Sequence, residues 1–181
     1  MKLLGISGSL RKGSFNSALL RAAVALAPAS IEFETHALDQ IPLYNEDVRS
    51  TGYPEPVLAL RAAIARAEAL LFVSPEYNYS IPGVLKNAID WASRGADQPF
   101  AGKPVAIMSA SGGVLGGARM QYHLRQVCVY LDMHPLNKPE VFVARAPEKF
   151  NAELELTDEA TKQVIVAQLD ALLRFRELLK T

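Results

Sequence analysis

The stretch KLLGISGSLRKGSFNSALLRAAVALA, residues 2–27, carries the pattern on which the fold prediction depends. Residues 2–7 form a short apolar run that predicts a buried strand. Residues 16–27 have helical spacing and good helix formers, and the pattern stops at Pro28. Between them lies GSLRKGSFN, residues 8–16, which is rich in small residues, hydroxyl groups and positive charge. The stretch therefore predicts a strand, a polar loop and a helix.

Apolar runs and amphipathic stretches alternate along the rest of the chain. Further strands are predicted at residues 31–38, 68–74, 103–110 and 139–144. Further helices are predicted at residues 56–67, 82–93 and 116–133, with a long closing helix capped by Thr157 or Asp158. Five such units predict the α/β class: a three-layer α/β/α sandwich around a five-stranded parallel sheet. The flavodoxin-like strand order 2-1-3-4-5 suits this number, and we expect residues 1–181 to form a single domain.

The composition argues against several classes of function. The 19 Lys and Arg residues balance the 19 Asp and Glu residues, so no net field attracts nucleic acid or an anionic membrane. The first ten residues lack the pattern of a signal peptide, so we expect none, and the longest uncharged stretch, residues 104–118, is shorter than a membrane span of ~18 apolar residues. One cysteine allows no internal disulfide, and the histidines lack the spacing of metal ligands. We expect a cytoplasmic protein that binds neither nucleic acid nor membranes.

Three loops should meet at the carboxyl edge of this sheet, at residues 8–15, 75–82 and 109–117. The first offers backbone N–H groups at a helix N-terminus, a common phosphate site. Ser14 occupies the place of the P-loop lysine, so a single terminal phosphate is favoured over a triphosphate. The alternative is an ordinary strand-to-helix turn in which Ser14 or Asn16 only caps the helix. The side chains that would add hydrogen bonds to a phosphate are Ser9, Arg11, Ser14, Asn16 and Ser17.

The other two loops suit a flat polar ring. In SPEYNYSIPG, residues 74–83, Asn78 can bond to the edge of a heterocycle while Tyr77 or Tyr79 packs against it. Each tyrosine could instead pack on the protein's own surface. The glycines of SASGGVLGG, residues 109–117, allow a ligand to approach the backbone, although the segment could also be a flexible connector. Together the three loops predict a mononucleotide with a flat ring.

GSLRKGSFN, SPEYNYSIPGVLKNAIDWAS and GGARMQYHLRQ resemble the NAD(P)H-dependent FMN reductases of flavodoxin-like fold, which include bacterial chromate, quinone and azo-dye reductases. The resemblance covers nearly the whole chain. It implies FMN as cofactor, NADPH or NADH as co-substrate, and a homodimer or homotetramer with flavin sites beside the subunit interface. Around the FMN phosphate it implies Ser9, Arg11, Ser14, Phe15, Asn16 and Ser17. Around the isoalloxazine it implies Pro75, Glu76, Tyr77, Asn78 and Tyr79, with Ser111, Gly112 and Gly113 along the pyrimidine edge.

The implied reaction passes a hydride from nicotinamide to flavin N5, after which an acceptor takes the electrons from the same face. Quinones, chromate, azo compounds and free flavin all remain open as acceptors. FMN carries the chemistry, so no residue is expected to be catalytic; backbone N–H groups of residues 111–113 would stabilise negative charge on the reduced flavin. An FMN-binding electron carrier is an alternative, but carriers dock through an acidic surface and this chain is neutral. A regulatory flavin-binding protein without NAD(P)H turnover is a second alternative.

Several other residues invite a functional interpretation. Glu76 is expected to pair with a charge or to reach a neighbouring subunit rather than to transfer a proton. Trp91 is expected in the core or an interface, and Cys128 is expected to be an inert buried thiol. The absence of a G-x-S-x-G sequence removes the α/β-hydrolase interpretation. Arg119 and Arg125 could meet a nicotinamide phosphate or a partner chain, and the sequence does not decide between them.

Overall fold

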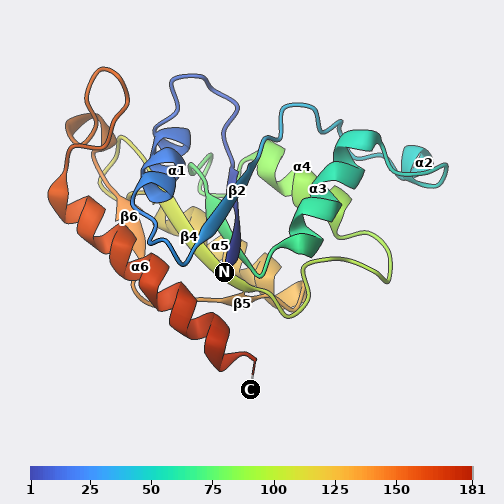
Figure 1. Cartoon of the computed structure of the whole chain (residues 1–181). Coiled ribbons are helices and arrows are strands. Elements are labelled where there is room, and N and C mark those ends of the chain that lie inside the picture. Colours follow the sequence, from blue (N-terminus) through green and yellow to red (C-terminus); the bar gives the residue numbers. More distant parts are fainter. Residues whose placement is uncertain (181) are drawn as a thin grey trace.

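The computed structural model describes residues 1–180 and has a parallel sheet between two layers of helices (Figure 1). The strands follow the order β2-β1-β3-β4-β5, with β6 also paired to β4, and all the pairs are parallel. The predicted flavodoxin-like order is therefore confirmed. The strands are β1 (Lys2–Ser7), β2 (Glu32–His36), β3 (Ala69–Val73), β4 (Pro104–Ala110), β5 (His134–Pro135) and β6 (Val141–Val143).

The last position of the sheet differs from the prediction because two short strands share it. β5 pairs with the start of β4, and β6 pairs with its end. The strand expected at residues 139–144 is present as β6 but starts only at Val141, and Pro139 at the start of the expected range has no N–H group to donate to a ladder. The strand β5 was not predicted. From α6, the side-chain amide of Gln168 donates to the carbonyls of Ile107 (3.3 Å) and Pro139 (2.7 Å). This side chain therefore joins β4 to the segment between the two short strands.

The helices divide between the two faces of the sheet (Figure 1). Helices α1 (Phe15–Ala25) and α6 (Glu159–Leu178) cover one face and bury side chains such as Leu19 and Leu169. The other face holds α3 (Glu55–Arg66), α4 (Gly83–Ala92) and α5 (Ala118–Tyr130), with Leu60, Leu85 and Leu124 in its core. A short helix, α2 (Glu46–Arg49), and a 3-10 turn, η1 (Ala146–Glu148), complete the chain. The sequence pattern predicted only a loop where α2 lies.

Close contacts hold the three predicted loops together at one edge of the sheet. The N–H group of Gly8 donates to the Val73 carbonyl (2.9 Å), and a Cβ at position 8 would lie 2.3 Å from Ser74 Oγ, so only glycine fits. Asn16 joins the first loop to the third. Its amide donates to the Ala110 carbonyl (2.9 Å), and its Oδ1 accepts from the Ala110 N–H group (2.8 Å). The expected convergence of the loops follows from these bonds.

Two of the other residues in question are buried. Trp91 is fully buried, and its Nε1 donates to the Pro42 carbonyl (2.8 Å), which ties the segment after β2 to α4. Cys128 is buried as well, and burial raises the pKa of its thiol to about 12, as expected of an inert cysteine. Among residues 1–180, none of the helices has the length and apolar character needed to cross a membrane.

Candidate functional site

The loop between β1 and α1 presents a row of backbone donors without protein acceptors. Ser14 caps α1, because its Oγ accepts from the N–H groups of Asn16 (3.2 Å) and Ser17 (3.3 Å). This cap does not use up the loop's donors. Within the described chain, five further N–H groups have no acceptor, those of Leu10, Arg11, Lys12, Gly13 and Phe15. Such a row at a helix N-terminus is a ready site for an anion.

The side chains predicted around the phosphate differ in what they already contact. Arg11 forms no ion pair within residues 1–180, and its guanidinium lies 6.0 Å from the centre of the Phe15 ring. The side-chain amide of Asn16 is committed to Ala110, so this residue holds the loop in place. Ser17 Oγ is 2.9 Å from Ser7 Oγ, which also accepts a long bond from the Ser9 N–H group (3.4 Å). Within the described chain, the Arg11 guanidinium and the Ser9 hydroxyl therefore remain open to a ligand, and Arg11 is the charged one of the two.

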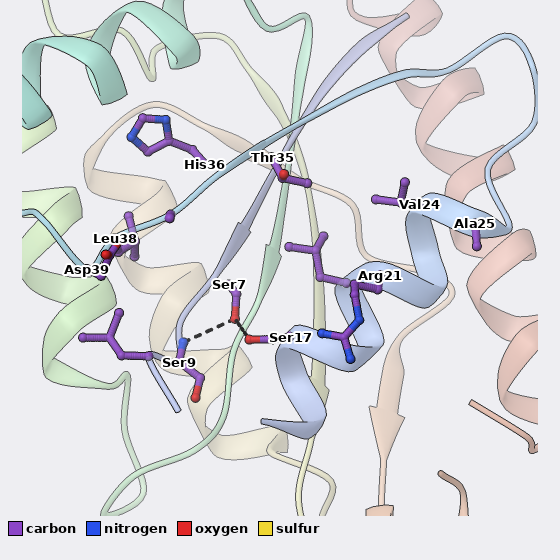
Figure 2. Close-up of a pocket in the computed structure, with 13 residues that line it drawn as sticks. Ser7, Ser9, Ser17, Arg21, Val24, Ala25, Thr35, His36, Leu38 and Asp39 are labelled. Atoms are coloured by element: carbon purple, nitrogen blue, oxygen red, sulfur yellow. Dashed lines mark hydrogen bonds between the residues drawn. The ribbon is translucent and has the colours of Figure 1, made fainter. Parts of the chain in front are cut away.

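A cleft of about 620 Å³ opens beside this loop, between α1 and the end of β2 (Figure 2). Ser9 and Ser17 line it, together with Arg21 and Thr35. Figure 2 shows the Arg21 side chain extending along α1 toward Ser17, and Arg21 has no ion pair among residues 1–180. Arg21 is not among the site residues predicted from the sequence, although its spacing of four residues from Ser17 places both on one helix face.

The loop after β3 is a tight turn that presents two tyrosine rings. The N–H group of Tyr77 donates to the Ser80 carbonyl (3.1 Å), and the Ser80 N–H group donates to Tyr77 (2.9 Å). Asn78 and Tyr79 between them have left-handed φ angles of 51° and 66°, as in the primed turns of hairpins. Tyr77 is 51% exposed and Tyr79 is 65% exposed. The internal bonds fix the turn and leave much of both aromatic side chains accessible.

Glu76 pairs with a charge on the neighbouring helix, one of the two roles that the sequence suggested. Its side chain is only 8% exposed, and Oε1 accepts from Arg119 Nε (2.6 Å). Oε2 accepts from the backbone N–H groups of Arg119 (3.0 Å) and Met120 (3.3 Å). The carboxylate therefore occupies the N-terminus of α5, where the helix dipole favours negative charge.

The glycine-rich loop after β4 is held by the segment that follows β6. Ser111 donates its N–H group to the Val143 carbonyl (3.0 Å), and its own carbonyl accepts from Ala146 (2.9 Å). Arg145 donates its N–H group to the Gly113 carbonyl (3.0 Å). Within residues 1–180, the N–H groups of Gly112 and Gly113 have no acceptor. The loop is thus a fixed pair of donors, which does not support the alternative of a flexible connector.

Four cationic side chains around this edge have no carboxylate partner in the described chain. Arg11, Lys12, Arg21 and Arg145 form no ion pair within the described residues. Arg145 has a left-handed φ of 49° beside the glycine-rich loop, and no sequence pattern pointed to it. Among residues 1–180, no three His, Cys, Asp or Glu side chains gather in a way that could hold a metal ion. Unpaired N–H donors, unpaired cations and exposed aromatic side chains together fit FMN, which has a phosphate at one end and a flat ring at the other.

The fold and this edge define a flavodoxin-like protein with a mononucleotide-binding site. Residues 1–148 match the family described as NADPH-dependent FMN reductase, and the chain belongs to that family. The expected oxidoreductase class, with FMN and NAD(P)H, is confirmed by this membership. An NAD(P)H-dependent FMN reductase of Pseudomonas aeruginosa is 56% identical, over 95% of this chain and 93% of the relative. A quinone reductase of Escherichia coli is 46% identical, over 99% of this chain and 97% of that one.

The likeness extends to a solved structure. The flavoenzyme FerB of Paracoccus denitrificans, an NAD(P)H:acceptor oxidoreductase, has a TM-score of 0.88 and 35% sequence identity to this chain. The likeness covers 97% of each chain. The two chains therefore share one fold over nearly their whole length.

Proposed function

We propose that this protein uses FMN to oxidise NADH or NADPH and to reduce quinones. The observation that carries the proposal is the row of unpaired N–H groups at the start of α1, beside two exposed tyrosine side chains on the neighbouring turn. Relatives named quinone reductase and NAD(P)H:quinone oxidoreductase, at 46% and 50% identity, support the choice of acceptor. Chromate, azo compounds and free flavin are further acceptors of the proposed enzyme. When bound, FMN supplies the centre that accepts the hydride and releases the electrons.

In the proposed complex the β1–α1 loop holds the phosphate. Arg11 would provide a charge-assisted hydrogen bond, and the N–H groups of residues 10–13 would provide neutral ones. Ser14 would keep its helix-capping bonds or turn its hydroxyl to the ligand. The proposed phosphate-binding residues are Ser9, Arg11, Ser14, Phe15 and Ser17, and Asn16 would hold the loop in place through Ala110.

The other two loops would hold the ring. The turn at residues 75–79 offers aromatic and amide surfaces in a fixed conformation, which lowers the entropy cost of binding. The N–H groups of Gly112 and Gly113 would lie along the pyrimidine edge and stabilise negative charge on a reduced ring. The proposed ring-binding residues are Pro75, Glu76, Tyr77, Asn78, Tyr79, Ser111, Gly112 and Gly113.

No side chain is required as a proton donor or acceptor in this scheme. Glu76, the carboxylate of the turn proposed to hold the ring, already accepts three hydrogen bonds at α5. The nicotinamide and the acceptor would use the same exposed face in turn, so we propose ping-pong kinetics. Patterns of parallel lines in double-reciprocal plots of nucleotide against quinone would support this order, and intersecting lines would contradict it.

The proposal extends to assembly as a homodimer or homotetramer in the cytoplasm. Val129 and Tyr130 at the end of α5 are 77% and 88% exposed, and exposed apolar groups of this size favour association. The molar mass from light scattering tests this part, since a monomer at micromolar concentration would contradict it.

Substitution of the phosphate loop tests the central claim. The purified protein should be yellow and should oxidise NADH or NADPH when a quinone is added. Arg11→Ala combined with Ser14→Ala should lower FMN affinity by about 100-fold or more, because one charge-assisted and several neutral hydrogen bonds are lost or misaligned. Arg174→Ala, at an exposed arginine of α6 without an ion pair in the described chain, is the control. Undiminished FMN affinity in the double variant would overturn the proposed site.

A further inference from the structure

The two arginines of α5 differ in how much of each guanidinium group is hydrogen-bonded to the protein. Arg125 uses both ends of its guanidinium on the protein: Nη1 donates to Asn137 Oδ1 (3.1 Å) and Nη2 donates to the Leu136 carbonyl (2.8 Å). Arg119 uses only Nε, which donates to Glu76 (2.6 Å). Within the described chain, neither Nη group of Arg119 has a hydrogen-bond partner, and the side chain is 39% exposed. Arg125 therefore connects α5 to residues 136–137, whereas the Nη groups of Arg119 remain available as donors.

The guanidinium of Arg119 is nevertheless held in place. Its central carbon lies 3.5 Å from the centre of the Tyr79 ring, so the cation rests on an aromatic face. Glu76 fixes the Nε edge at the same time. A long side chain held at two points has lost much of its rotamer entropy before a ligand arrives, which favours binding through the remaining donors.

The negative charge of Glu76 does not fully cancel this cation. One carboxylate oxygen contacts Arg119 Nε, while the other accepts the N–H groups of Arg119 and Met120 at the start of α5. The carboxylate is thus shared between the guanidinium and the positive end of the helix dipole. The open Nη edge keeps a positive potential that favours an anion.

We infer that Arg119 binds a phosphate group of the nicotinamide dinucleotide substrate. This inference rests on the proposed function, in which the nicotinamide packs over a ring beside Tyr79. In a dinucleotide the nearest phosphate is one ribose away from the nicotinamide, and a planar guanidinium with free Nη groups suits phosphate oxygens. The source of the phosphate is either the pyrophosphate, common to NADH and NADPH, or the 2′-phosphate of NADPH alone.

Arg119→Lys is the sharpest variant, because lysine keeps a cation beside Glu76 but removes the two open Nη groups. In the FMN-loaded enzyme we expect KM for the nucleotide to rise about tenfold, the usual effect of losing a charge-assisted hydrogen bond. The kcat, the KM for the quinone and the FMN affinity should stay near those of the unchanged protein. Arg125→Lys is the matched control on the same helix and should leave nucleotide KM unchanged.

A binding measurement without turnover completes the test. Titration calorimetry of the oxidised holoenzyme should give weaker binding of ADP, which carries a diphosphate, in Arg119→Lys if the pyrophosphate is bound, with little change for 2′,5′-ADP, which has two separate monophosphates. Weaker binding of 2′,5′-ADP alone, with a raised KM for NADPH alone, supports the inference with the 2′-phosphate as ligand. Unchanged nucleotide KM and binding, or a change confined to quinone KM or FMN affinity, would overturn it. Failure of the proposed function looks different, because the unchanged protein would then show no NAD(P)H turnover.

Discussion

Helices α1 and α5 begin at the same edge of the sheet, yet different groups accept hydrogen bonds from the backbone N–H groups at their N-termini. At α1 the cap is the neutral hydroxyl of Ser14, and several N–H groups of the preceding loop have no protein acceptor within residues 1–180. At α5 the carboxylate of Glu76 accepts two backbone N–H groups, so the protein's own anion occupies the position. The N-terminus of α1 can therefore bind an anionic ligand, whereas Glu76 already occupies the N-terminus of α5.

This difference shows why a phosphate belongs at α1. Both helix ends offer partial positive charge, so the dipole alone does not choose between them. The choice comes from the side chains in reach: unpaired Arg11 at α1, and buried Glu76 at α5. The hydrogen bonds of Glu76 to α5 also help to hold the turn at residues 75–79, which carries Glu76 and the two exposed tyrosines. Substitutions at these two helix ends, and at the N-terminus of α6 outside the site, can therefore test the difference.

The largest effect is expected when a carboxylate is placed at the N-terminus of α1, as Glu76 is placed at α5. Ser14→Asp should preserve the free energy of unfolding within about 0.5 kcal/mol, because aspartate and serine are comparable N-caps. FMN affinity should fall by about 100-fold or more, since the carboxylate would face the phosphate, and like charges at an interface cost several kcal/mol. Urea unfolding of the apoprotein and FMN titration measure the two quantities. Ser14→Thr is the control, and wild-type FMN affinity in Ser14→Asp would contradict a phosphate at α1.

The second effect concerns the clamp that holds the start of α1 against β4. Asn16→Ala leaves the buried N–H and carbonyl groups of Ala110 without partners. The free energy of unfolding should fall by about 2–6 kcal/mol, at about 1–3 kcal/mol for each of the two unsatisfied groups. Urea unfolding measures it. Asn137→Ala, which removes one exposed bond to Arg125, should cost less than about 1 kcal/mol, and equal losses in the two variants would refute the clamp.

The third prediction concerns removal of the carboxylate from the N-terminus of α5. Glu76→Ala removes three hydrogen bonds and should lower the free energy of unfolding by about 2 kcal/mol, with Glu76→Gln less affected because its amide oxygen still accepts. In Glu76→Ala the N-terminus of α5 should then have unpaired N–H groups, like the N-terminus of α1. Sulfate should bind there and restore part of the thermal stability of Glu76→Ala, but it should have no such effect on Glu76→Gln. Thermal unfolding with and without sulfate measures this. An equal response of both variants would show that the carboxylate does not keep anions away from α5.

Much of the fold was predictable because it depends on local periodicity. The apolar runs of β1, β3 and β4 and the helical spacing between them gave the layers and the strand order. The split between β5 and β6 was not predictable, since pairing with β4 is decided by contacts such as that of Gln168 with Pro139, 29 residues away. The short helix α2 has only one turn, too little for its spacing to stand out.

The candidate site was predictable to the level of loops. Hydroxyl, glycine and tyrosine residues after three strands indicated which segments meet, and the structure brings them together. The individual roles depend on geometry that the residue types do not contain. Asn16 was grouped with phosphate ligands although its amide is used on Ala110, and Arg119 was not separable from Arg125 until their partners were known.

The smallest effect is expected at a third helix end, that of α6, which lies outside the proposed site. Asp158 Oδ2 accepts from the hydroxyl (2.5 Å) and the N–H group (2.9 Å) of Thr161, and these bonds lower the pKa of Asp158 below its usual 3.8. Asp158→Ala should lower the free energy of unfolding by about 1 kcal/mol at pH 7 and leave FMN affinity unchanged.

The sign of the pH dependence follows from the lowered pKa of Asp158. Its stabilisation is complete above the ordinary value of 3.8 and is lost as the pH falls through the lower folded value. The difference in unfolding free energy between the unchanged protein and Asp158→Ala should therefore shrink in acid, as measured by urea unfolding from pH 7 downward. Asp158→Asn, a neutral cap, should differ from alanine by an amount independent of pH. A constant difference between the unchanged protein and Asp158→Ala at every pH would mean that the negative charge of Asp158 does not stabilise α6, and that its contribution is that of a neutral cap.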